Sequence, residues 1–162
     1  MGRRKKEDVL SNKLVLRGFA RVQIGDPSGK IVGDSGWVKN ALTADGLDNY
    51  VAARVGSIAQ GKNPMNLQLA TQTAAFNTTQ TSLTGETRIR VTAARSTVAT
   101  GTLRMTGSWS STDNGAAITI GAIGVYNISS GGTLGSGATF TASQWGTNQD
   151  VSASYEWRFS TA

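Results

Sequence analysis

The chain has 162 residues, with 16 Lys and Arg against 10 Asp and Glu for a net charge of +6, and it contains no histidine and no cysteine. Histidine is the commonest general base and metal ligand, and the cysteine thiolate is the usual soft ligand and reactive nucleophile. Their absence excludes Ser-His-Asp and Cys-His catalysis, zinc and iron–sulfur sites, and disulfides. We therefore predict a structural building block with no enzymatic activity and no cofactor.

The positive charge is concentrated at the N-terminus. The first 21 residues carry seven basic and two acidic side chains, whereas the rest of the chain carries nine and eight. Four of the basic residues are consecutive: Arg3, Arg4, Lys5 and Lys6. We interpret residues 1–12 as a basic N-terminal arm and residues 13–162 as one β-sandwich domain. The arm is predicted to dock on an acidic protein surface, with a solvated tail as the alternative. Nucleic acid is disfavoured, since no aromatic residue in the run can stack on a base.

Membrane insertion and secretory export are not expected. No stretch approaches the about 20 apolar residues of a membrane span. No apolar core of a signal peptide follows the basic start either.

The first predicted element is a strand over residues 13–24. Apolar side chains alternate there with polar and basic ones, the period of a half-buried antiparallel strand. The turn residues of 25–29 then favour a hairpin with 30–32 as the returning strand.

One helix is predicted, over residues 44–55. Thr43 is a suitable N-cap and Gly56 a suitable stop. An apolar face at three- and four-residue steps is formed by Leu47, Tyr50, Val51 and Val55. Asp45 and Asp48 favour the positive first turn, which explains this carboxylate pair better than catalysis does. We expect a packing helix that covers one end of a sheet.

The remainder has the alternation and turn spacing of an all-β domain. Residues 118–126 are apolar on both faces and predict a central, doubly buried strand, whereas the Gly-rich residues 129–137 predict a flexible surface loop. The final strand, 151–159, places Trp157 on an apolar face and Glu156 on the solvent face. The fold class is therefore all-β: an antiparallel β-sandwich, jelly-roll-like, with one short packing helix.

Few residues are candidates for a functional site. Four further carboxylates stand singly in turns or on solvent faces: Glu86, Asp113, Asp150 and Glu156. No metal site is expected from them. Trp37 and Trp145 lie beside glycines in loop-like contexts, and we interpret them as interface aromatics. Stacking of these two tryptophans on sugars is the alternative, which would make the protein a carbohydrate-binding adhesin.

The order of these parts resembles a loose family of tailed-bacteriophage virion proteins of the tail fibre, head fibre and capsid decoration type. The resembling segments are residues 14–18, 37–42, 46–50, 69–73, 83–86, 118–126 and 155–159. The resemblance implies a small non-enzymatic β-sandwich, assembled in several copies on the virion, with a trimer as the favoured oligomer. The basic arm, residues 1–12, lies outside the resembling segments.

We therefore expect a virion protein whose partners are other phage capsid or tail proteins. Decoration of the head surface is the first choice, because the chain lacks the long repeats of a fibre shaft. A tail or tail-fibre adaptor and the adhesin are the alternatives.

Overall fold

The computed structural model describes residues 14–57, 59 and 61–161. The basic arm, with Arg3, Arg4, Lys5 and Lys6, lies outside the described residues. Among the described residues, ten strands and one helical segment make up the regular structure. The strands are β1 (Leu14–Gly25), β2 (Ile31–Asp34), β3 (Val38–Leu42), β4 (Asn66–Ala70), β5 (Val91–Thr92), β6 (Ala94–Ala99), β7 (Thr102–Trp109), β8 (Ile118–Tyr126), β9 (Leu134–Trp145) and β10 (Asp150–Thr161).

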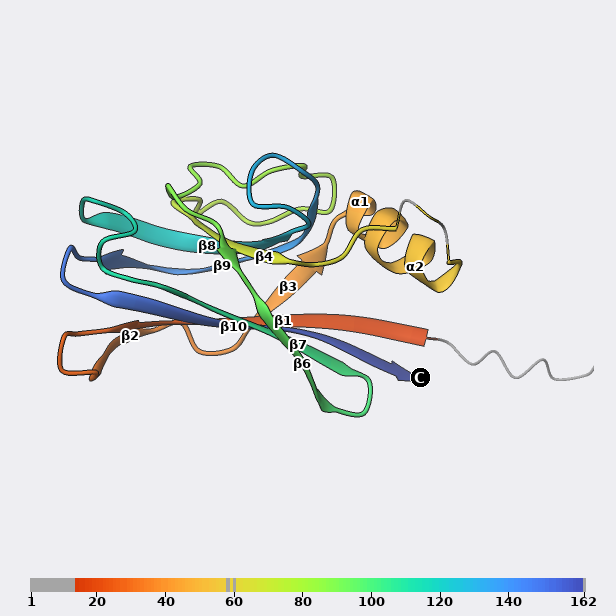
Figure 1. Ribbon diagram of the computed structural model, residues 1–162, viewed down its shortest axis with the longest axis horizontal. Helices are drawn as coiled ribbons and strands as arrows, with labels where there is room; N and C mark the ends of the chain where they lie inside the picture. The colour runs from red at the N-terminus through yellow and green to blue at the C-terminus, as the bar shows by residue number, and fades with distance from the viewer. Residues whose placement is uncertain (1–13, 58, 60, 162) are drawn as a thin grey trace, which may run out of the picture.

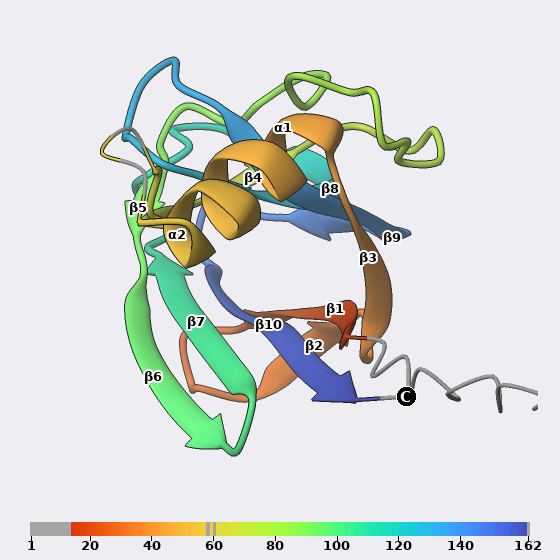
Figure 2. The same ribbon diagram turned by 90° about the vertical axis from the view of Figure 1, so that its right-hand side faces the viewer.

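The strands form one antiparallel sheet that folds over on itself into two layers. The order along the sheet is β5-β4-β8-β9-β3-β1-β10-β7-β6, with β2 paired to β1. Figure 2 shows β4, β8 and β9 in one layer and β1, β10, β7 and β6 in the other. The all-β, antiparallel, sandwich-like prediction is thereby confirmed.

The two layers are joined along both sides. On one side β3 pairs with β1 through residues 38–40 and with β9 through residues 41 and 42, so a single strand belongs to both layers. On the other side residues 91–99 first pair with β4 as β5 and then with β7 as β6. The two ends of the sheet are therefore consecutive in the chain, and the sandwich is closed there by covalent continuity.

The first and last strands are neighbours in one layer. β1 and β10 pair from Leu14 opposite Thr161 to Gly25 opposite Asp150 (Figure 1). The predicted alternation holds in both strands, because one face of each is covered by the other layer: Ala20, Val22, Val151 and Tyr155 are among the buried side chains. Both described ends of the chain therefore lie at the same end of the sandwich.

The predicted helix is confirmed as one continuous segment made of α1 (Ala44–Gly46), a π-helical turn η1 (Leu47–Ala52) and α2 (Ala53–Val55). It lies across one end of the sandwich, as Figure 2 shows. The Thr43 hydroxyl accepts from the Gly46 amide at 2.8 Å, so the cap is as predicted. The predicted apolar face is only partly buried, because Tyr50 packs inward whereas Leu47 and Val55 remain exposed.

The Gly-rich loop predicted over residues 129–137 is shorter in the structure. Residues 134–137 are buried and belong to β9. Glycine is needed at two of these positions because aromatic rings lie directly over the backbone: a Cβ on Gly137 would lie 2.3 Å from the Phe76 ring, and one on Gly135 would lie 3.1 Å from the Tyr50 ring. The glycines thus serve close packing and not only flexibility.

The core lies between the layers. β8 is paired on both sides and buried along most of its length, as predicted. Trp109 and Trp157 are also buried, and the Tyr50 ring meets Trp157 edge to face at 6.1 Å between ring centroids. The helix is thereby fixed to the core by one aromatic contact.

Candidate interaction surface

Basic side chains gather on the outer face of the layer that holds the two terminal strands. Strand register places Lys39, Phe19, Glu156 and Arg104 in one row, and Arg17, Arg158 and Thr102 in the next. Paired residues in a sheet share a face, so these two rows form one continuous surface. They hold four basic side chains and one carboxylate, and we call Arg17, Lys39, Arg104 and Arg158 the basic face.

The carboxylate at the centre of this surface is buried between two arginines. Glu156 is 2% exposed. Arg104 binds its Oε1, with Nε at 2.8 Å and Nη2 at 2.6 Å, and Arg158 binds its Oε2, with Nε at 2.7 Å and Nη2 at 2.6 Å. Burial by itself raises the pKa of Glu156, but the hydrogen bonds from the two arginines outweigh it and hold that pKa below its usual range. The carboxylate is ionised at neutral pH and leaves the group with one net positive charge.

An aromatic ring completes the same surface. The Arg158 guanidinium lies over the Phe19 ring, with Cζ 4.4 Å from the ring centroid. Phe19 is opposite Glu156 in the register of β1 and β10. The stacking fixes the position of Arg158 and at the same time covers an apolar ring on an outward face.

The basic face lies close to the point where the arm joins the domain. The described chain begins at Leu14, an exposed residue opposite Thr161, and Arg17 is opposite Arg158 only three residues further along. The sequence prediction treated the arm as basic and the domain as nearly neutral. The fold adds that four of the domain's cations gather near Leu14, where the described chain begins.

The two tryptophans proposed as interface aromatics have different environments. Trp37 lies between β2 and β3 and is 43% exposed, so it is available to a partner. Trp145 is only 1% exposed, and its Nε1 donates to the Gln149 carbonyl at 2.6 Å. The interpretation of Trp145 as an interface or sugar-stacking residue is wrong, because β9 continues to this residue and turns it into the core.

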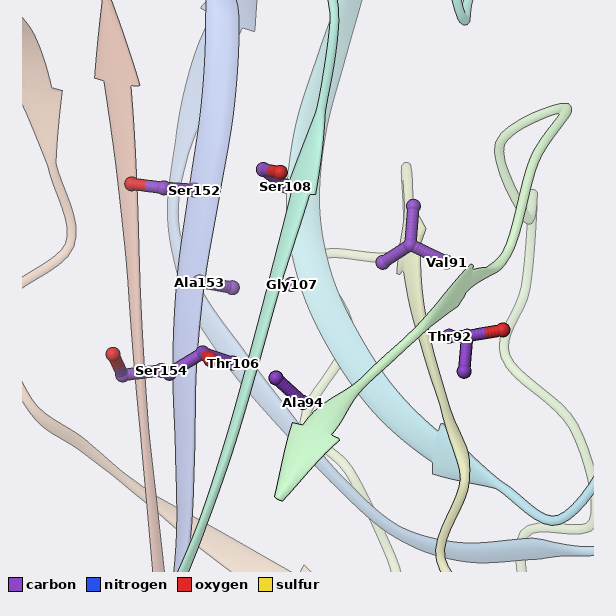
Figure 3. A pocket seen from close by; sticks show the side chains of 9 residues that line it. All are labelled: Val91, Thr92, Ala94, Thr106, Gly107, Ser108, Ser152, Ala153 and Ser154. Carbon is purple, nitrogen blue, oxygen red and sulfur yellow. The ribbon is translucent and has the colours of Figure 1, made fainter. Parts of the chain in front are cut away.

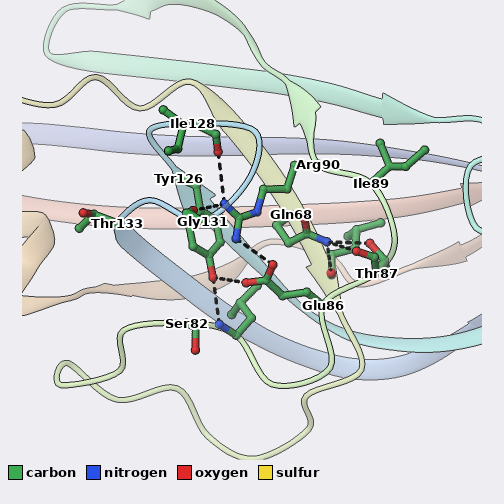
Figure 4. Close-up of polar contacts among 12 residues, drawn as sticks. Gln68, Ser82, Glu86, Thr87, Ile89, Arg90, Tyr126, Ile128, Gly131 and Thr133 are labelled. Carbon is green, nitrogen blue, oxygen red and sulfur yellow. Dashed lines mark hydrogen bonds and ion pairs between the residues drawn. The ribbon is translucent and has the colours of Figure 1, made fainter.

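A second polar cluster joins the loops at the outer side of the other layer (Figure 4). The Tyr126 hydroxyl donates to Glu86 Oε1 at 2.5 Å, and Arg90 Nη2 donates to Glu86 Oε2 at 2.8 Å. The Arg90 guanidinium also lies 3.5 Å from the centre of the Tyr126 ring. Arg90 donates further to the carbonyls of Ile128 and Gly131. Burial, together with the Glu86 carboxylate, raises the pKa of the Tyr126 hydroxyl well above its usual range.

This cluster is a structural connection between loops. Arg90 and Tyr126 bring together the segment before β5 and the loop after β8, and the Leu83 amide donates to the Tyr126 hydroxyl at 3.0 Å. Below it the buried Gln68 donates to the Thr87 carbonyl at 2.9 Å. The carboxylate and the guanidinium of this cluster both take part in holding the loops together.

A hollow of about 460 Å³ opens where β6 leaves β7 (Figure 3). Its nine lining residues are small and uncharged, and five of them carry hydroxyls: Thr92, Thr106, Ser108, Ser152 and Ser154. None of the nine is aromatic, so the hollow offers no stacking surface to a sugar ring. It gives no support to the adhesin hypothesis.

Comparison of the chain with protein-family models, with curated proteins and with solved structures finds no match. Among the described residues, no three acidic side chains come together in a group that could hold a metal ion. Over the same part of the chain, no helix is both long enough and apolar enough to cross a membrane.

Sequence reasoning missed both arginine–carboxylate clusters. Glu86 and Glu156 were expected to stand singly, but each contacts an arginine. Alternation placed Glu156 correctly on the outer face, and only the register of β1, β7 and β10 shows that its neighbours bury it. For Glu86, Arg90 lies only four residues further along the chain, but Tyr126 lies 40 residues away and no local pattern connects it to the pair.

Proposed function

We propose that this protein is a non-enzymatic structural component of a tailed-bacteriophage virion, and that it decorates the surface of the head. The phage assignment depends on the sequence resemblance. The observation that supports attachment is the position of the basic face beside the root of the basic arm. The basic face gives the domain a positively charged surface, and the arm adds four consecutive basic residues to the sequence, so an acidic particle surface is the complementary partner.

The proposal includes assembly in several copies, with a trimer as the favoured oligomer. The exposed Trp37 supports it, together with Ile31 and Val32, which are exposed on the neighbouring strand β2. Apolar side chains of this size are enriched at the centres of protein interfaces. Light scattering of the purified protein measures the oligomer directly. A monomer at micromolar concentration, with Trp37→Ala unchanged, would remove this part of the proposal.

The jelly-roll description also belongs to the proposal. It predicts Greek-key connections between the two layers of the folded sheet in an experimental structure. Connections that join only neighbouring strands of the sheet would replace this description.

The decisive experiment is to locate the chain in purified particles. We expect peptides of the protein in gradient-purified virions and antibody label over the head. Deletion of residues 1–8 should lower the copy number per particle, and increasing salt should lower it further because exposed charges are screened within about 10 Å at 0.1 M. Absence from the virion would overturn the proposal, and label confined to the tail would replace head decoration by the tail-adaptor alternative.

Catalysis is tested separately. Purified protein should not turn over polysaccharide, peptidoglycan or nucleotide substrates. Turnover that is abolished by changing one Asp or Glu would make the protein an enzyme and contradict the proposal.

A further inference from the structure

β1 has a free backbone edge at the end where the arm joins it. Its pairing with β10 runs over all twelve residues, but on the other side β3 pairs only with Gly18, Phe19 and Ala20. Among the described residues, no strand pairs with residues 14–17 on that side. Four residues of a strand extend over roughly 13 Å and present unpaired N–H and C=O groups. Such an edge is the surface to which an extended peptide adds as a further strand.

The edge opens into a groove of about 420 Å³ between β1, β3 and the start of the helix. Its ten lining residues include the apolar side chains Leu16, Phe19, Leu42 and Leu47. Two basic residues, Arg17 and Lys39, also lie at the groove, and none of its lining residues among the described part of the chain is acidic. A groove with apolar and basic side chains is thus joined to a free strand edge.

The pairing of β1 with β3 stops at one closely packed residue pair, beside the groove. Asn40 is opposite Gly18, and a Cβ on Gly18 would lie 1.6 Å from the Asn40 Oδ1. The Asn40 side chain therefore occupies the space above the glycine backbone. Beyond this pair β3 turns to β9, where Ala41 and Leu42 pair with Gly137 and Ser136. Because β3 is committed to β9, it cannot cover the edge of β1.

We propose that this groove binds an extended segment of a partner protein in which apolar and acidic residues alternate. Side chains of a strand alternate between two faces, so one set fills the groove between Leu16 and Leu47 while the other meets Arg17 and Lys39. The positive charge of the groove favours an acidic segment. A basic segment, including the arm of a second copy, would be repelled. The groove shares Arg17 and Lys39 with the basic face, but strand addition at residues 14–17 goes beyond the proposed function.

The test uses the full chain and a synthetic peptide of alternating Leu and Glu, followed by fluorescence anisotropy. We expect saturable binding that weakens with salt, and no binding of the matching Leu and Lys peptide. A Leu and Glu peptide that is N-methylated at alternate amides should also fail, because it has lost the donors of one strand edge. Equal binding of the methylated peptide would overturn strand addition.

Matched variants locate the binding site. Leu47→Asp should weaken binding by about tenfold, whereas Val55→Asp, also an exposed apolar residue of the helix, should leave it unchanged. Lys39→Glu should weaken it by about tenfold, with Arg95→Glu on β6 as the control. Circular dichroism and thermal melting verify that each variant is folded.

Three outcomes would overturn the proposal. The first is equal loss in the test and control variants. The second is self-association that Leu47→Asp abolishes, because the occupant would then be another copy. The third is peptide binding that appears only after residues 1–12 are deleted, because the occupant would then be the chain's own arm. The location of the protein in the virion is measured independently, so failure of the groove leaves the proposed function standing.

Discussion

The two arginine–carboxylate clusters differ in which partner is buried. In the loop cluster, Glu86, Arg90 and Tyr126, the cation is the enclosed group: the Arg90 side chain is 8% exposed and lies against the Tyr126 ring. In the sheet cluster, Arg104, Glu156 and Arg158, the carboxylate is enclosed and both arginines reach solvent.

The difference decides what each cluster can do. A buried charge is costly to leave without a partner, whereas an exposed one is solvated by water. The loop cluster has a single cation that serves several acceptors, so it depends on one residue. The sheet cluster has two cations on one carboxylate, so one arginine can be lost or can move toward a partner while the other remains. A connection between loops suits the first arrangement, and a contact surface suits the second.

The largest effect is expected for Arg90→Ala. The change removes the partner of Glu86, two hydrogen bonds to loop carbonyls and the stacking on Tyr126. The free energy of unfolding should fall by about 3 kcal/mol in urea denaturation. Arg95→Ala, an exposed residue on β6, is the control and should change it by less than about 0.5 kcal/mol. A loss below about 1 kcal/mol for Arg90→Ala would mean that the loops hold together without the cluster.

Glu156→Gln should have the next largest effect. The free energy of unfolding should fall by about 2 kcal/mol at pH 7, because the amide cannot accept from two guanidinium groups at once. The effect should depend on pH. The folded-state pKa of Glu156 is lowered, so its contribution is present above the unfolded-state value of about 4.3 and is lost as pH falls through the folded-state value. Wild type should therefore lose more stability than Glu156→Gln between pH 5 and the acid limit.

Some dependence on pH should remain in Glu156→Gln. Asp34 also has a lowered pKa, chiefly through its hydrogen bond from Arg21. Identical slopes of stability against pH in the two proteins would contradict the assignment of Glu156 as the ionised centre of the sheet cluster.

Substitution of either arginine of the sheet cluster alone should have a smaller effect, lowering the free energy of unfolding by about 1 kcal/mol or less. Arg104→Ala leaves Glu156 with Arg158, and Arg158→Ala leaves it with Arg104. The double variant should lose more than the two single losses together, since only then is the buried carboxylate without a partner. A double-mutant cycle measures this coupling. Simple additivity would show that the arginines act independently and that the contrast with the loop cluster is wrong.

The smallest effect is expected for Tyr155→Phe. Tyr155 is fully buried, and its hydroxyl and the Asn40 side-chain amide both lack a hydrogen-bond partner of normal geometry. Burial raises the pKa of this hydroxyl, which the nearby Ser136 and Asn40 side chains reduce only in part. Removal of a hydroxyl without a partner costs little, so the free energy of unfolding should change by less than about 0.5 kcal/mol. A larger loss would reveal a partner for this hydroxyl.

Local sequence patterns were sufficient to predict the secondary-structure elements, but not to predict which elements pack beside one another. The alternation of residues 151–159 and the cap at Thr43 depend on nearby residues, and both appear as predicted. The burial of Glu156 depends on β7, which lies about 50 residues earlier in the chain, and no periodicity within β10 carries that information.

The errors have the same origin. Trp145 was assigned to a loop because Gly146 follows it, but β9 extends to this residue through its pairing with Ile118. Residues 134–137 looked flexible because they are rich in Gly, whereas Phe76 and Tyr50 require small residues there. In both cases a distant segment of the chain decided the local structure. The basic face has the same dependence, because it combines residues from β1, β3, β7 and β10.

The pairing of the first described strand with the last one has a consequence for synthesis in the cell. β1 leaves the ribosome before β10 and must wait for this partner before the middle of its layer can form. Chains emerge at about 5–20 residues per second, so β1 remains without this partner for roughly 10 s. Contacts so distant in sequence also fold slowly. The sandwich should therefore close only after β10 has emerged, and until then the growing chain is a substrate for chaperones that bind exposed strands.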